Sequence, residues 1–331
     1  MTTIKEIAEK SGYSSATVSR LLNNDPKLSI TADTKKKILD LANELGYWDN
    51  HREKTIKPTI ALLYRVNSLE RLQDEYFISL REKIVDVAKN ENIKMSIFEN
   101  IDDLIKNASE FQGFIGVGSG DISIESLKKL HEVLPNGIFI DTNPAPHLFD
   151  SIKPNLRLTI RDAVDQLLTS GYKKIGFIGG WGAKFNHIQE KDIRETTFRD
   201  YTAALKIEDA PIYASGAFSV KNGYKLGLEV AQHPLPDAFI IASDTLSVGV
   251  LQAFNEQEIN VPKDVAIISI NNSNVANYVS PPLTSYNINQ SELVTQAIKL
   301  LIDLIKRPQR PHEEVNVSTN LVIRKSFVPN N

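Results

Sequence analysis

Hydrophobic residues in the first 47 positions recur at the spacing of short amphipathic helices. Three apolar stripes occur, and their members are Ile4, Ile7 and Ala8, then Val18, Leu21 and Leu22, then Ile38, Leu41, Ala42 and Leu45. Residues three or four positions apart lie on the same face of a helix, so each stripe forms one buried face. The pattern predicts three short helices around one small core.

Polar residues and glycines mark the ends of these predicted helices. Thr3, followed three residues later by a glutamate, forms a capping box at the start of the first helix. Gly12 supplies a turn, and Ser14 caps the second helix. Thr31 caps the third helix, which ends at Gly46. The first two helices and the turn between them therefore predict a helix-turn-helix unit.

The second helix carries small or polar side chains outside its apolar stripe. These residues are Ser15, Ala16, Ser19, Arg20 and Asn23. A DNA major groove admits such a helix, and short side chains let its backbone approach the phosphates. Residues 1–57 have a net charge of +2 and the remainder −5, so DNA affinity would need a dimer with hydroxyl, amide and backbone contacts to phosphate. A module that docks on another protein is the alternative interpretation.

From about residue 59 the pattern changes to short apolar runs with helical segments between them. The runs are Ile60–Tyr64, Phe114–Val117, Gly137–Asp141, Ile175–Ile178, Ala238–Ala242 and Val265–Ile270. Helical patterns occur at 76–90, Val164–Ser170 and Val248–Asn255. Strands that alternate with helices predict parallel sheets covered on both faces, and the number of units predicts two such sheets.

Composition supports a multidomain protein outside the membrane. At 331 residues the chain exceeds one typical domain, and 41% hydrophobic residues are enough for sizeable cores. There is no cysteine, which excludes a disulfide framework and a thiolate metal site. No apolar run reaches the length of a membrane span, and the N-terminus lacks the hydrophobic region of a signal peptide. We therefore expect a cytoplasmic protein.

Several motifs together resemble the LacI/GalR family of transcriptional repressors. They are Ile4–Ala8, Ser14–Asn23, Thr31–Thr34 and Glu44–Tyr47 in the first part of the chain, and Gly171–Gly180, Ala242–Asp244 and Ser280–Thr284 further on. Within the family the resemblance is greatest to the galactose-operon and evolved-β-galactosidase repressors. It implies a helix-turn-helix headpiece followed by an α/β core with two lobes, like a periplasmic sugar-binding protein.

The resemblance also implies a domain organisation. We expect a DNA-binding domain at 1–47, a linker or atypical hinge at 48–58, and an effector-binding and dimerisation domain at 59–331. The chain would cross between the lobes more than once. Lobe 1 is expected at about 59–156 and 285–316, and lobe 2 at about 157–284 and 317–329.

By the same resemblance, the outer face of the second helix reads DNA. Ser15, Ala16 and Arg20 would face base edges, and Arg20 is the long donor among them, suited to a guanine. The expected phosphate contacts are Thr3, Ser14, Thr17, Ser19 and Asn23. The partner would be a palindromic operator bound by a homodimer, with half-site spacing fixed by the dimer.

Candidate effector residues come from strand ends and from the family pattern. In doubly wound sheets a ligand lies beyond the carboxyl ends of the strands, which selects Asp141, Ser243, Asp244 and Asn271, together with Gly179–Gly182 and Asn272. The resemblance adds three residues: Arg194 for sugar hydroxyls, Phe218 against the sugar ring, and Tyr76 from the other lobe. Ser243 replaces the asparagine of many family members, and Asn271 replaces their aspartate.

Some of these residues have structural alternatives. Asp141 could be an ordinary turn carboxylate, Asp244 could cap the following helix, and Phe218 could belong to the core. Arg194 is the strongest candidate, because a guanidinium presents a rigid fork of donors to neighbouring hydroxyls. An amide at Asn271 both donates and accepts without charge, so the family's sugar contacts do not transfer unchanged.

No motif indicates an enzyme. The glycine-rich run Gly176–Gly182 fits neither the dinucleotide nor the Walker pattern, and His131–Glu132 lacks the second histidine of a zinc hydrolase. A Gly-x-Ser-x-Gly motif is also missing. We expect neither catalytic nor metal-binding residues, and no cofactor.

The sequence thus predicts a repressor of a carbohydrate-utilisation operon, with galactose or a galactoside as a candidate effector. Two alternatives remain: a family member controlled by a protein corepressor, and a solute-binding protein, against which the headpiece argues. Family members usually have a hinge helix with a leucine that wedges into the minor groove. Here Trp48–Lys57 is shorter and highly charged, and Ile56 is its one aliphatic residue. We therefore expect more loosely joined headpieces, with more specificity in the second helix.

Overall fold

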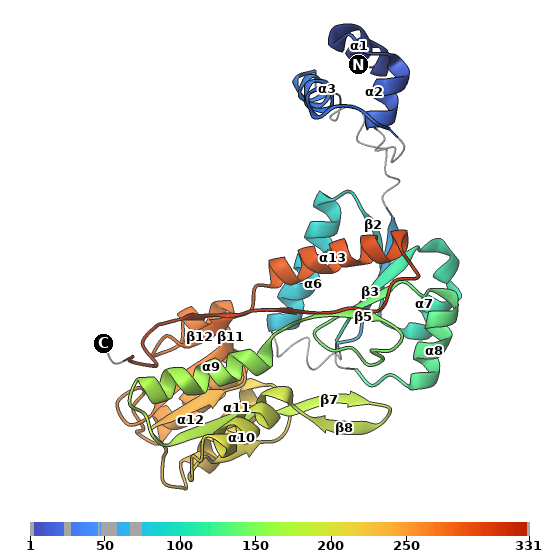
Figure 1. Ribbon diagram of the computed structural model, residues 1–331. Coiled ribbons are helices and arrows are strands. Elements are labelled where there is room, and N and C mark those ends of the chain that lie inside the picture. The colour runs from blue at the N-terminus through green and yellow to red at the C-terminus, as the bar shows by residue number, and fades with distance from the viewer. Residues whose placement is uncertain are drawn as a thin grey trace. The chain divides into compact units, whose positions relative to one another are not determined.

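The computed structural model describes residues 3–22, 28–45, 47, 58–66, 75–118 and 120–329. The chain forms two compact units, residues 1–57 and 58–331, which are shown in Figure 1 and treated separately below. Three of the sequence expectations fall outside the described residues. They are the phosphate contact of Asn23, the helix end at Gly46 and the hinge at 48–57.

The first unit consists of α1 (Ile4–Ser11), α2 (Ser15–Leu22) and α3 (Ala32–Glu44). The side chain of Thr3 accepts a hydrogen bond from the backbone N–H of Glu6, as the capping motif predicts. Gly12 ends α1 with a φ of 78°, a left-handed conformation that costs glycine little. Ser14 and Thr31 cap the next two helices through the N–H groups of Thr17 and Thr34. Local sequence therefore sets these four helix ends.

One small core holds the three helices together. Its buried members are Ile7, Ala8, Val18, Leu21, Leu22, Ile38, Ala42 and Tyr47. The predicted stripes supply all of these except Tyr47. Leu41 and Leu45 are only partly buried at its edge. The helix-turn-helix expected from periodicity is confirmed.

The first lobe of the second unit is built on a parallel sheet with the order β13-β5-β4-β3-β1-β2. Its strands are β1 (Thr59–Tyr64), β2 (Lys94–Phe98), β3 (Gly113–Val117), β4 (Gly137–Ile140), β5 (Asp150–Pro154) and β13 (Glu314–Val317). Its helices are α6 (Glu75–Asn90), α7 (Ile101–Lys106), α8 (Ile124–Val133) and α13 (Gln290–Lys306), with the 3₁₀ turn η1 (Ala108–Glu110).

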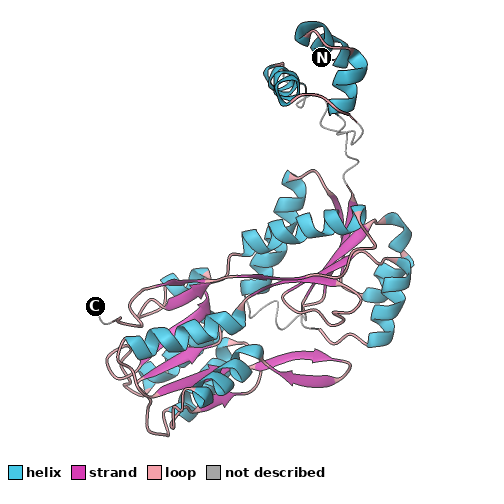
Figure 2. Cartoon of the chain, in the orientation of Figure 1, coloured by secondary structure: helices cyan, strands magenta, loops and turns pink. Residues whose placement is uncertain are grey.

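Alternate residues of β1 show how helices cover both faces of this sheet. Ile60, Leu62 and Tyr64 belong to the cluster that contains Leu80 of α6 and residues of α13. Ala61 and Leu63 belong to a second cluster with α7 and α8. Side chains of a strand alternate between its two faces, so α6 and α13 lie on one face and α7 and α8 on the other. Figure 2 shows these two helix layers.

The second lobe contains a sheet with the order β14-β12-β11-β10-β6-β9, in which only the β12–β14 pair is antiparallel. Its strands are β6 (Ile175–Gly179), β9 (Ile212–Ala214), β10 (Ala238–Ile241), β11 (Ala266–Asn271), β12 (Thr284–Asn287) and β14 (Asn320–Val322). Its helices are α9 (Leu156–Thr169), α10 (Ile193–Ala204), α11 (Val220–Val230) and α12 (Asp244–Glu256), with the 3₁₀ turn η2 (Asn274–Asn277). The expected pair of parallel sheets is therefore present.

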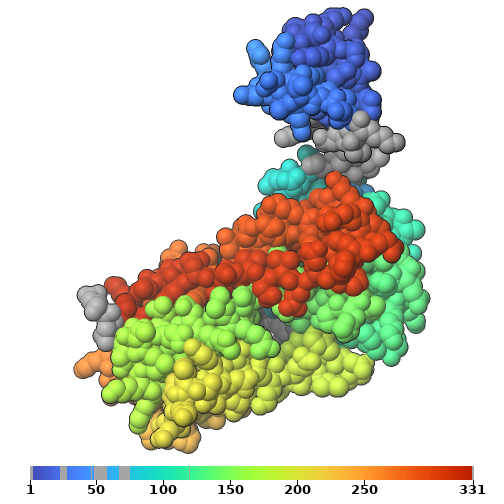
Figure 3. All heavy atoms as spheres, in the orientation of Figure 1, coloured from blue at the N-terminus to red at the C-terminus, as the bar shows by residue number. Residues whose placement is uncertain are grey.

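The chain passes between the lobes three times, close to Asn155, after Asn287 and after Val317. Two expected boundaries need correction. Residues 285–287 pair in the second sheet through β12, and Val317 still pairs in the first through β13. β12 consists mostly of polar residues and β13 alternates polar residues with valines, so neither contains the aliphatic run by which strands were predicted. The last crossing continues as a long segment along both lobes in Figures 1 and 3.

A two-stranded hairpin, β7 (Trp181–Phe185) and β8 (Ile188–Lys191), extends from the second lobe between β6 and α10. Asn186 and His187 form its tip with φ values of 46° and 67°. Two consecutive residues at positive φ match the twist of a tight hairpin, and asparagine tolerates this conformation. The hairpin therefore projects from the end of the sheet where the candidate effector residues lie.

Candidate functional site

The outer face of α2 is exposed as a DNA-reading helix requires. Ser15, Ala16 and Arg20 are exposed, and Thr17 and Ser19 are partly buried. The remaining positions, Val18, Leu21 and Leu22, are buried in the small core. The arrangement gives the helix one outer surface of short side chains with one long cationic donor.

The two expected phosphate contacts at helix starts already serve as caps. Thr3 accepts from the N–H of Glu6 at 3.2 Å, and Ser14 accepts from the N–H of Thr17 at 3.1 Å. An accepting hydroxyl still carries a proton that it can donate to a phosphate oxygen. Capping and phosphate contact are therefore compatible at these two exposed positions.

In the second lobe, Arg194 lies in the first turn of α10 and is held by three groups. Its Nε and Nη2 donate to the two carboxylate oxygens of Asp192, both at 2.7 Å. Its Nη1 donates to the carbonyl of Ala242, at the carboxyl end of β10, at 2.7 Å. The guanidinium carbon lies 4.5 Å from the centre of the Phe218 ring. Arg194 and Phe218, both candidate residues from the sequence, are thus in contact, and Asp192 was not among the candidates.

Phe218 is half-buried between Arg194 and the glycine-rich turn after β6. A Cβ atom added to Gly180 would lie 3.1 Å from the Phe218 ring, so glycine permits this close approach. The ring therefore supports the guanidinium, and a sugar would meet the part of the ring that Arg194 does not cover. The core alternative for Phe218 also keeps some support, because the residue packs partly against the main hydrophobic cluster.

Ser243 and Asp244 follow β10, and the fold itself uses both side chains. Ser243 is the N-cap of α12, and its Oγ accepts from the N–H of Leu246. Asp244 is fully buried and accepts hydrogen bonds from Ser285 at 2.7 Å and from the N–H and hydroxyl of Ser273 at 2.7 and 3.0 Å. Burial raises the pKa of the Asp244 carboxyl, against the effect of these hydrogen bonds. The capping role suggested for Asp244 belongs to its neighbour.

Asn271 ends β11 with a φ of 112°, a backbone conformation that L-residues seldom adopt. Asn272 follows at 54°, and its side-chain oxygen accepts from Nη2 of Arg324 at 2.7 Å. Backbone conformations of this kind concentrate at functional sites. Arg324 comes from the last segment of the chain, and sequence reasoning missed it because 52 residues separate it from its partner.

The first lobe contributes Tyr76 and Asp141 as a pair. The Tyr76 hydroxyl donates to Oδ1 of Asp141 at 2.9 Å, which joins α6 to the carboxyl end of β4. Asp141 has a φ of 72°, so this strand end is also strained. The two lobe-1 candidates thus lie together, and the lobe-2 candidates gather at the ends of β6, β10 and β11.

The hairpin tip forms a contact between the lobes that the sequence did not reveal. The N–H and Nδ1 of His187 lie 3.1 and 2.7 Å from the carboxylate of Asp121 in lobe 1, and Nζ of Lys184 lies 3.9 Å from it. The backbone hydrogen bond from His187 contributes most to lowering the pKa of Asp121. Nη2 of Arg65, just after β1, donates to the Asp121 carbonyl at 2.6 Å. Asp121 is therefore fixed from both lobes.

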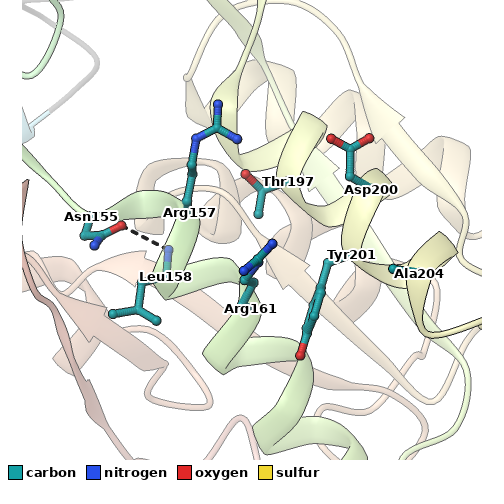
Figure 4. A pocket seen from close by; sticks show the side chains of 8 residues that line it. All are labelled: Asn155, Arg157, Leu158, Arg161, Thr197, Asp200, Tyr201 and Ala204. Carbon is teal, nitrogen blue, oxygen red and sulfur yellow. Dashed lines mark hydrogen bonds between the residues drawn. The ribbon is translucent and has the colours of Figure 1, made fainter.

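Two surface grooves accompany these features. One, of about 350 Å³, lies between α9 and α10 and is drawn in Figure 4. In this groove the guanidinium of Arg161 lies over the ring of Tyr201. The hydroxyl of Tyr201 donates a hydrogen bond to the carboxylate of Asp165. The other, of about 380 Å³, lies beside the hairpin and includes Gly180 and Trp181. The α9–α10 groove is on a helical surface away from the strand ends, so it does not coincide with the candidate effector site.

Two further findings concern the described residues as a set. Among them, no group of three or more histidine, aspartate or glutamate side chains is arranged to bind a metal ion. Within the same residues, no helix combines the length and apolar character needed to cross a bilayer.

Comparisons with known proteins agree with this division of the chain. The profile of bacterial regulatory proteins of the lacI family matches residues 3–50, and that of the periplasmic binding protein-like domain matches residues 164–327. The transcriptional regulator LacR of Lactobacillus helveticus is 61% identical over 99% of both chains. The regulator GanR of Bacillus subtilis is 41% identical over 99% of this chain and 100% of its own.

Solved structures show the same fold at low identity. The regulator CelR in complex with cellobiose has a TM-score of 0.68 at 21% identity, covering 99% of this chain and 100% of its own. The Lac repressor dimer bound to operator and the anti-inducer ONPF has a TM-score of 0.67 at 18% identity, covering 98% of each chain. These two likenesses concern the fold of both units.

Proposed function

The chain belongs to the lacI family of bacterial regulatory proteins and is a DNA-binding transcriptional regulator, and on this basis we propose that it represses a carbohydrate-utilisation operon under the control of a small sugar. The sugar would bind between the lobes, and galactose or a galactoside is our candidate. The observation that carries the sugar assignment is Arg194, fixed beside Phe218 at the carboxyl ends of the second sheet. A guanidinium next to an aromatic ring provides donors for hydroxyls and a surface for the apolar face of a sugar.

We assign the remaining contacts by position. In lobe 2, Ser243 and Asn271 lie at neighbouring strand ends, and in lobe 1 Tyr76 and Asp141 form one hydrogen-bonded pair. The carboxylate of Asp244 already accepts hydrogen bonds from Ser285 and Ser273. We therefore assign Asp244 a role in holding the segments of this site together. No observation favours a protein corepressor over a sugar.

The operator would be palindromic and bound by a homodimer. Exposed apolar side chains support a dimer face on the first lobe: Ile78 and Val85, seven residues apart on α6, and Ile97 on the neighbouring edge strand β2. Exposed apolar patches of this kind often mark protein interfaces. Replacing Ile78 and Val85 by glutamate should then give monomers in light scattering and weaken operator binding.

Each headpiece would place α2 in the major groove, with Ser15, Ala16 and Arg20 towards base edges. The hydroxyls of Thr3, Ser14, Thr17 and Ser19, with Asn23, would contact phosphates. Because residues 48–57 lack the usual leucine, we propose that specificity depends mainly on α2. A complex with an ordered hinge helix wedged into the operator would contradict this part.

The DNA-binding assignment is tested with operators selected from random DNA. Arg20→Ala should reduce discrimination between the selected site and variants at one base pair, by about 1–3 kcal/mol for a lost bidentate contact. Lys36→Ala on α3 is the control, because an exposed lysine changes affinity equally for all sequences. Unchanged discrimination by Arg20→Ala would remove Arg20 from base reading.

The sugar assignment is tested by calorimetry with galactose, lactose, glucose and related sugars, followed by operator binding with the sugar that binds. Arg194→Ala should weaken binding, whereas Arg199→Ala, five residues further along the same helix and exposed, should not. A protein that binds none of these sugars, or needs a second protein for its response, would contradict the proposal.

A further inference from the structure

Asp192 determines where Arg194 can point. It is the N-cap of α10, its side chain is 11% exposed, and Oδ1 accepts from both the backbone N–H and Nε of Arg194 at 2.8 and 2.7 Å. Oδ2 accepts from Nη2 at 2.7 Å. One carboxylate therefore starts the helix and fixes the guanidinium plane.

Two other segments complete the fixation. Nη1 of Arg194 donates to the Ala242 carbonyl at the end of β10, and Phe218 covers one face of the guanidinium. The side chain is held from the helix start, the strand end and the loop before α11. A donor fixed in advance loses little conformational entropy when it binds a ligand, so this arrangement favours affinity.

The pairing also determines which ligand charge the site accepts. The Nε and Nη2 edge of a guanidinium is the edge that grips a carboxylate or phosphate with two parallel hydrogen bonds. Here Asp192 occupies that edge and cancels the positive charge. On the lobe-1 side, Asp141 adds a carboxylate, and the guanidinium of Arg65 is paired with Asp121. An anionic ligand would compete with Asp192, whereas a sugar hydroxyl needs a single donor and no net charge.

We infer that Asp192 is a positioning residue that presents Arg194 to hydroxyl groups and selects an uncharged sugar over sugar phosphates and sugar acids. This inference rests on the proposed sugar site. It assigns to Asp192 two separable effects, one on the orientation of Arg194 and one on the charge of the site.

The test uses the full-length protein and calorimetric titration with galactose, galactose 6-phosphate and galacturonic acid, or the corresponding series of whichever neutral sugar binds. Wild type should prefer the neutral sugar. Asp192→Asn keeps the size and a good cap residue, but it removes the charge and one acceptor. We expect it to weaken neutral-sugar binding about 10-fold or more, from the loss of a charge-assisted hydrogen bond, and to shift the preference towards the anionic sugars.

Asp192→Glu separates the two effects and also covers the case in which the asparagine variant does not fold. Glutamate retains the negative charge but displaces the carboxylate by one methylene, so neutral-sugar affinity should fall while anions stay excluded. The control is Ser219→Ala, which removes the N-cap of the neighbouring helix α11 without touching Arg194.

The outcomes distinguish this inference from the proposed function. If wild type binds no sugar, the proposed function fails and the inference with it. If wild type binds the neutral sugar but Asp192→Asn changes neither its affinity nor the preference over anions, only the role of Asp192 is overturned. A wild-type preference for the phosphate or the acid would overturn it as well.

Discussion

The carboxylate of Asp244 is completely buried and accepts hydrogen bonds from Ser273 and Ser285. It joins α12 to the segment after β11 and to β12, which are more than 25 residues away along the chain. A buried charge is tolerated in a protein when its hydrogen-bonding capacity is satisfied. At the scale of one residue, an aspartate at a strand end thus stabilises the segments that form the proposed effector site.

Asp244→Asn should lower the free energy of unfolding by about 1–3 kcal/mol, because one buried oxygen becomes an NH₂ group that faces donors. Burial raises the folded-state pKa of Asp244 above the ordinary 3.8. The folded protein then holds this proton more tightly, so the contribution of Asp244 to stability falls as pH rises from 3.8 through the folded-state pKa. Denaturant unfolding of both proteins across this range measures the effect. A variant as stable as wild type would contradict it.

A second residue-scale prediction concerns Arg310, which is 6% exposed and pairs with the fully buried Asp150. Arg310→Ala removes the arginine partner of that carboxylate and leaves it with His312 Nδ1 and the N–H of Glu313, so it should cost about 3 kcal/mol in denaturant unfolding. Arg307→Ala is the matched control. Arg307 binds Asp303, which also pairs with Arg310, but it is 64% exposed, so its loss should cost less than about 1 kcal/mol. If the two substitutions lowered the free energy of unfolding equally, burial of the ion pair would not determine its contribution to stability.

Residue identities were predictable where a local motif carries the information. The caps Thr3, Ser14 and Thr31 follow from residues three positions ahead. The contact between Arg194 and Phe218 agrees with the motifs that place both in the proposed site. The partners Asp192, Arg65 and Asp121 were not predictable as site residues, since their roles depend on contacts that only the folded lobes create. No pattern in one sequence marks the pairing of Arg65 with a carbonyl 56 residues away.

At the scale of elements, the β7–β8 hairpin links the two lobes beside the proposed effector site. Asp121→Asn weakens its contact with Nδ1 of His187 and its ion pair with Lys184. For the proposed sugar we expect faster dissociation in stopped-flow measurements and a weaker overall affinity, because the arrangement in which the hairpin joins the two lobes loses a contact. The pKa of Asp121 is lowered, so the contact should persist above the ordinary pKa of an aspartate and disappear only as pH falls through the lower, folded-state value.

The control for this prediction is Asp103→Asn, which removes an exposed carboxylate paired with Lys106 on α7 of lobe 1. It changes the protein's charge by the same amount and does not touch the hairpin. Sugar dissociation that is equally fast in both variants would assign the effect to net charge rather than to the hairpin.

The aliphatic strands were predictable and the polar ones were not. β1, β3, β4, β6, β10 and β11 appear where apolar runs predict them, because both faces of these strands are buried. β13 alternates exposed and partly buried residues, and every residue of β8 is exposed. Edge strands and an isolated hairpin bury little surface, so their sequences carry little periodic hydrophobicity. The positions of these polar strands are therefore known from the structure and not from hydrophobic periodicity.

At the scale of the whole molecule, the proposed function requires the headpiece and the sugar site to be thermodynamically coupled. If sugar weakens operator affinity by a given factor, operator must weaken sugar affinity by the same factor. Couplings of this kind are typically about 1–3 kcal/mol. Anisotropy titrations of operator with and without sugar, and of sugar with and without operator, should give equal factors.

The coupling should vanish in Arg194→Ala, which is expected to bind operator normally and to ignore sugar. Unequal factors in wild type would indicate an additional state or a change of oligomer during the titration. A sugar that binds without any effect on operator affinity would instead separate the two units functionally.

The two-sheet architecture could be anticipated from the sequence, but the path of the chain between the sheets could not be placed precisely. The crossing near Asn155 lies close to the expected position because α9 follows it with a clear apolar stripe. The crossing after Asn287 was misplaced, since β12 contains threonine, serine, tyrosine and asparagine. Family resemblance supplied the number of crossings, and pairing partners decide their positions.

The last crossing has a genetic consequence. A nonsense mutation just after codon 319 would leave the coding sequence of both sheets intact up to β13, yet it deletes β14, Arg324 and the fully buried Phe327. It also deletes Ser326, whose hydroxyl donates to Ile267 and accepts from the backbone of Thr284. Lobe 2 would lose an edge strand and part of its core while the headpiece coding sequence stayed intact. Such late alleles should therefore be as defective in repression as early ones, and the operon should be expressed constitutively in cells that carry them.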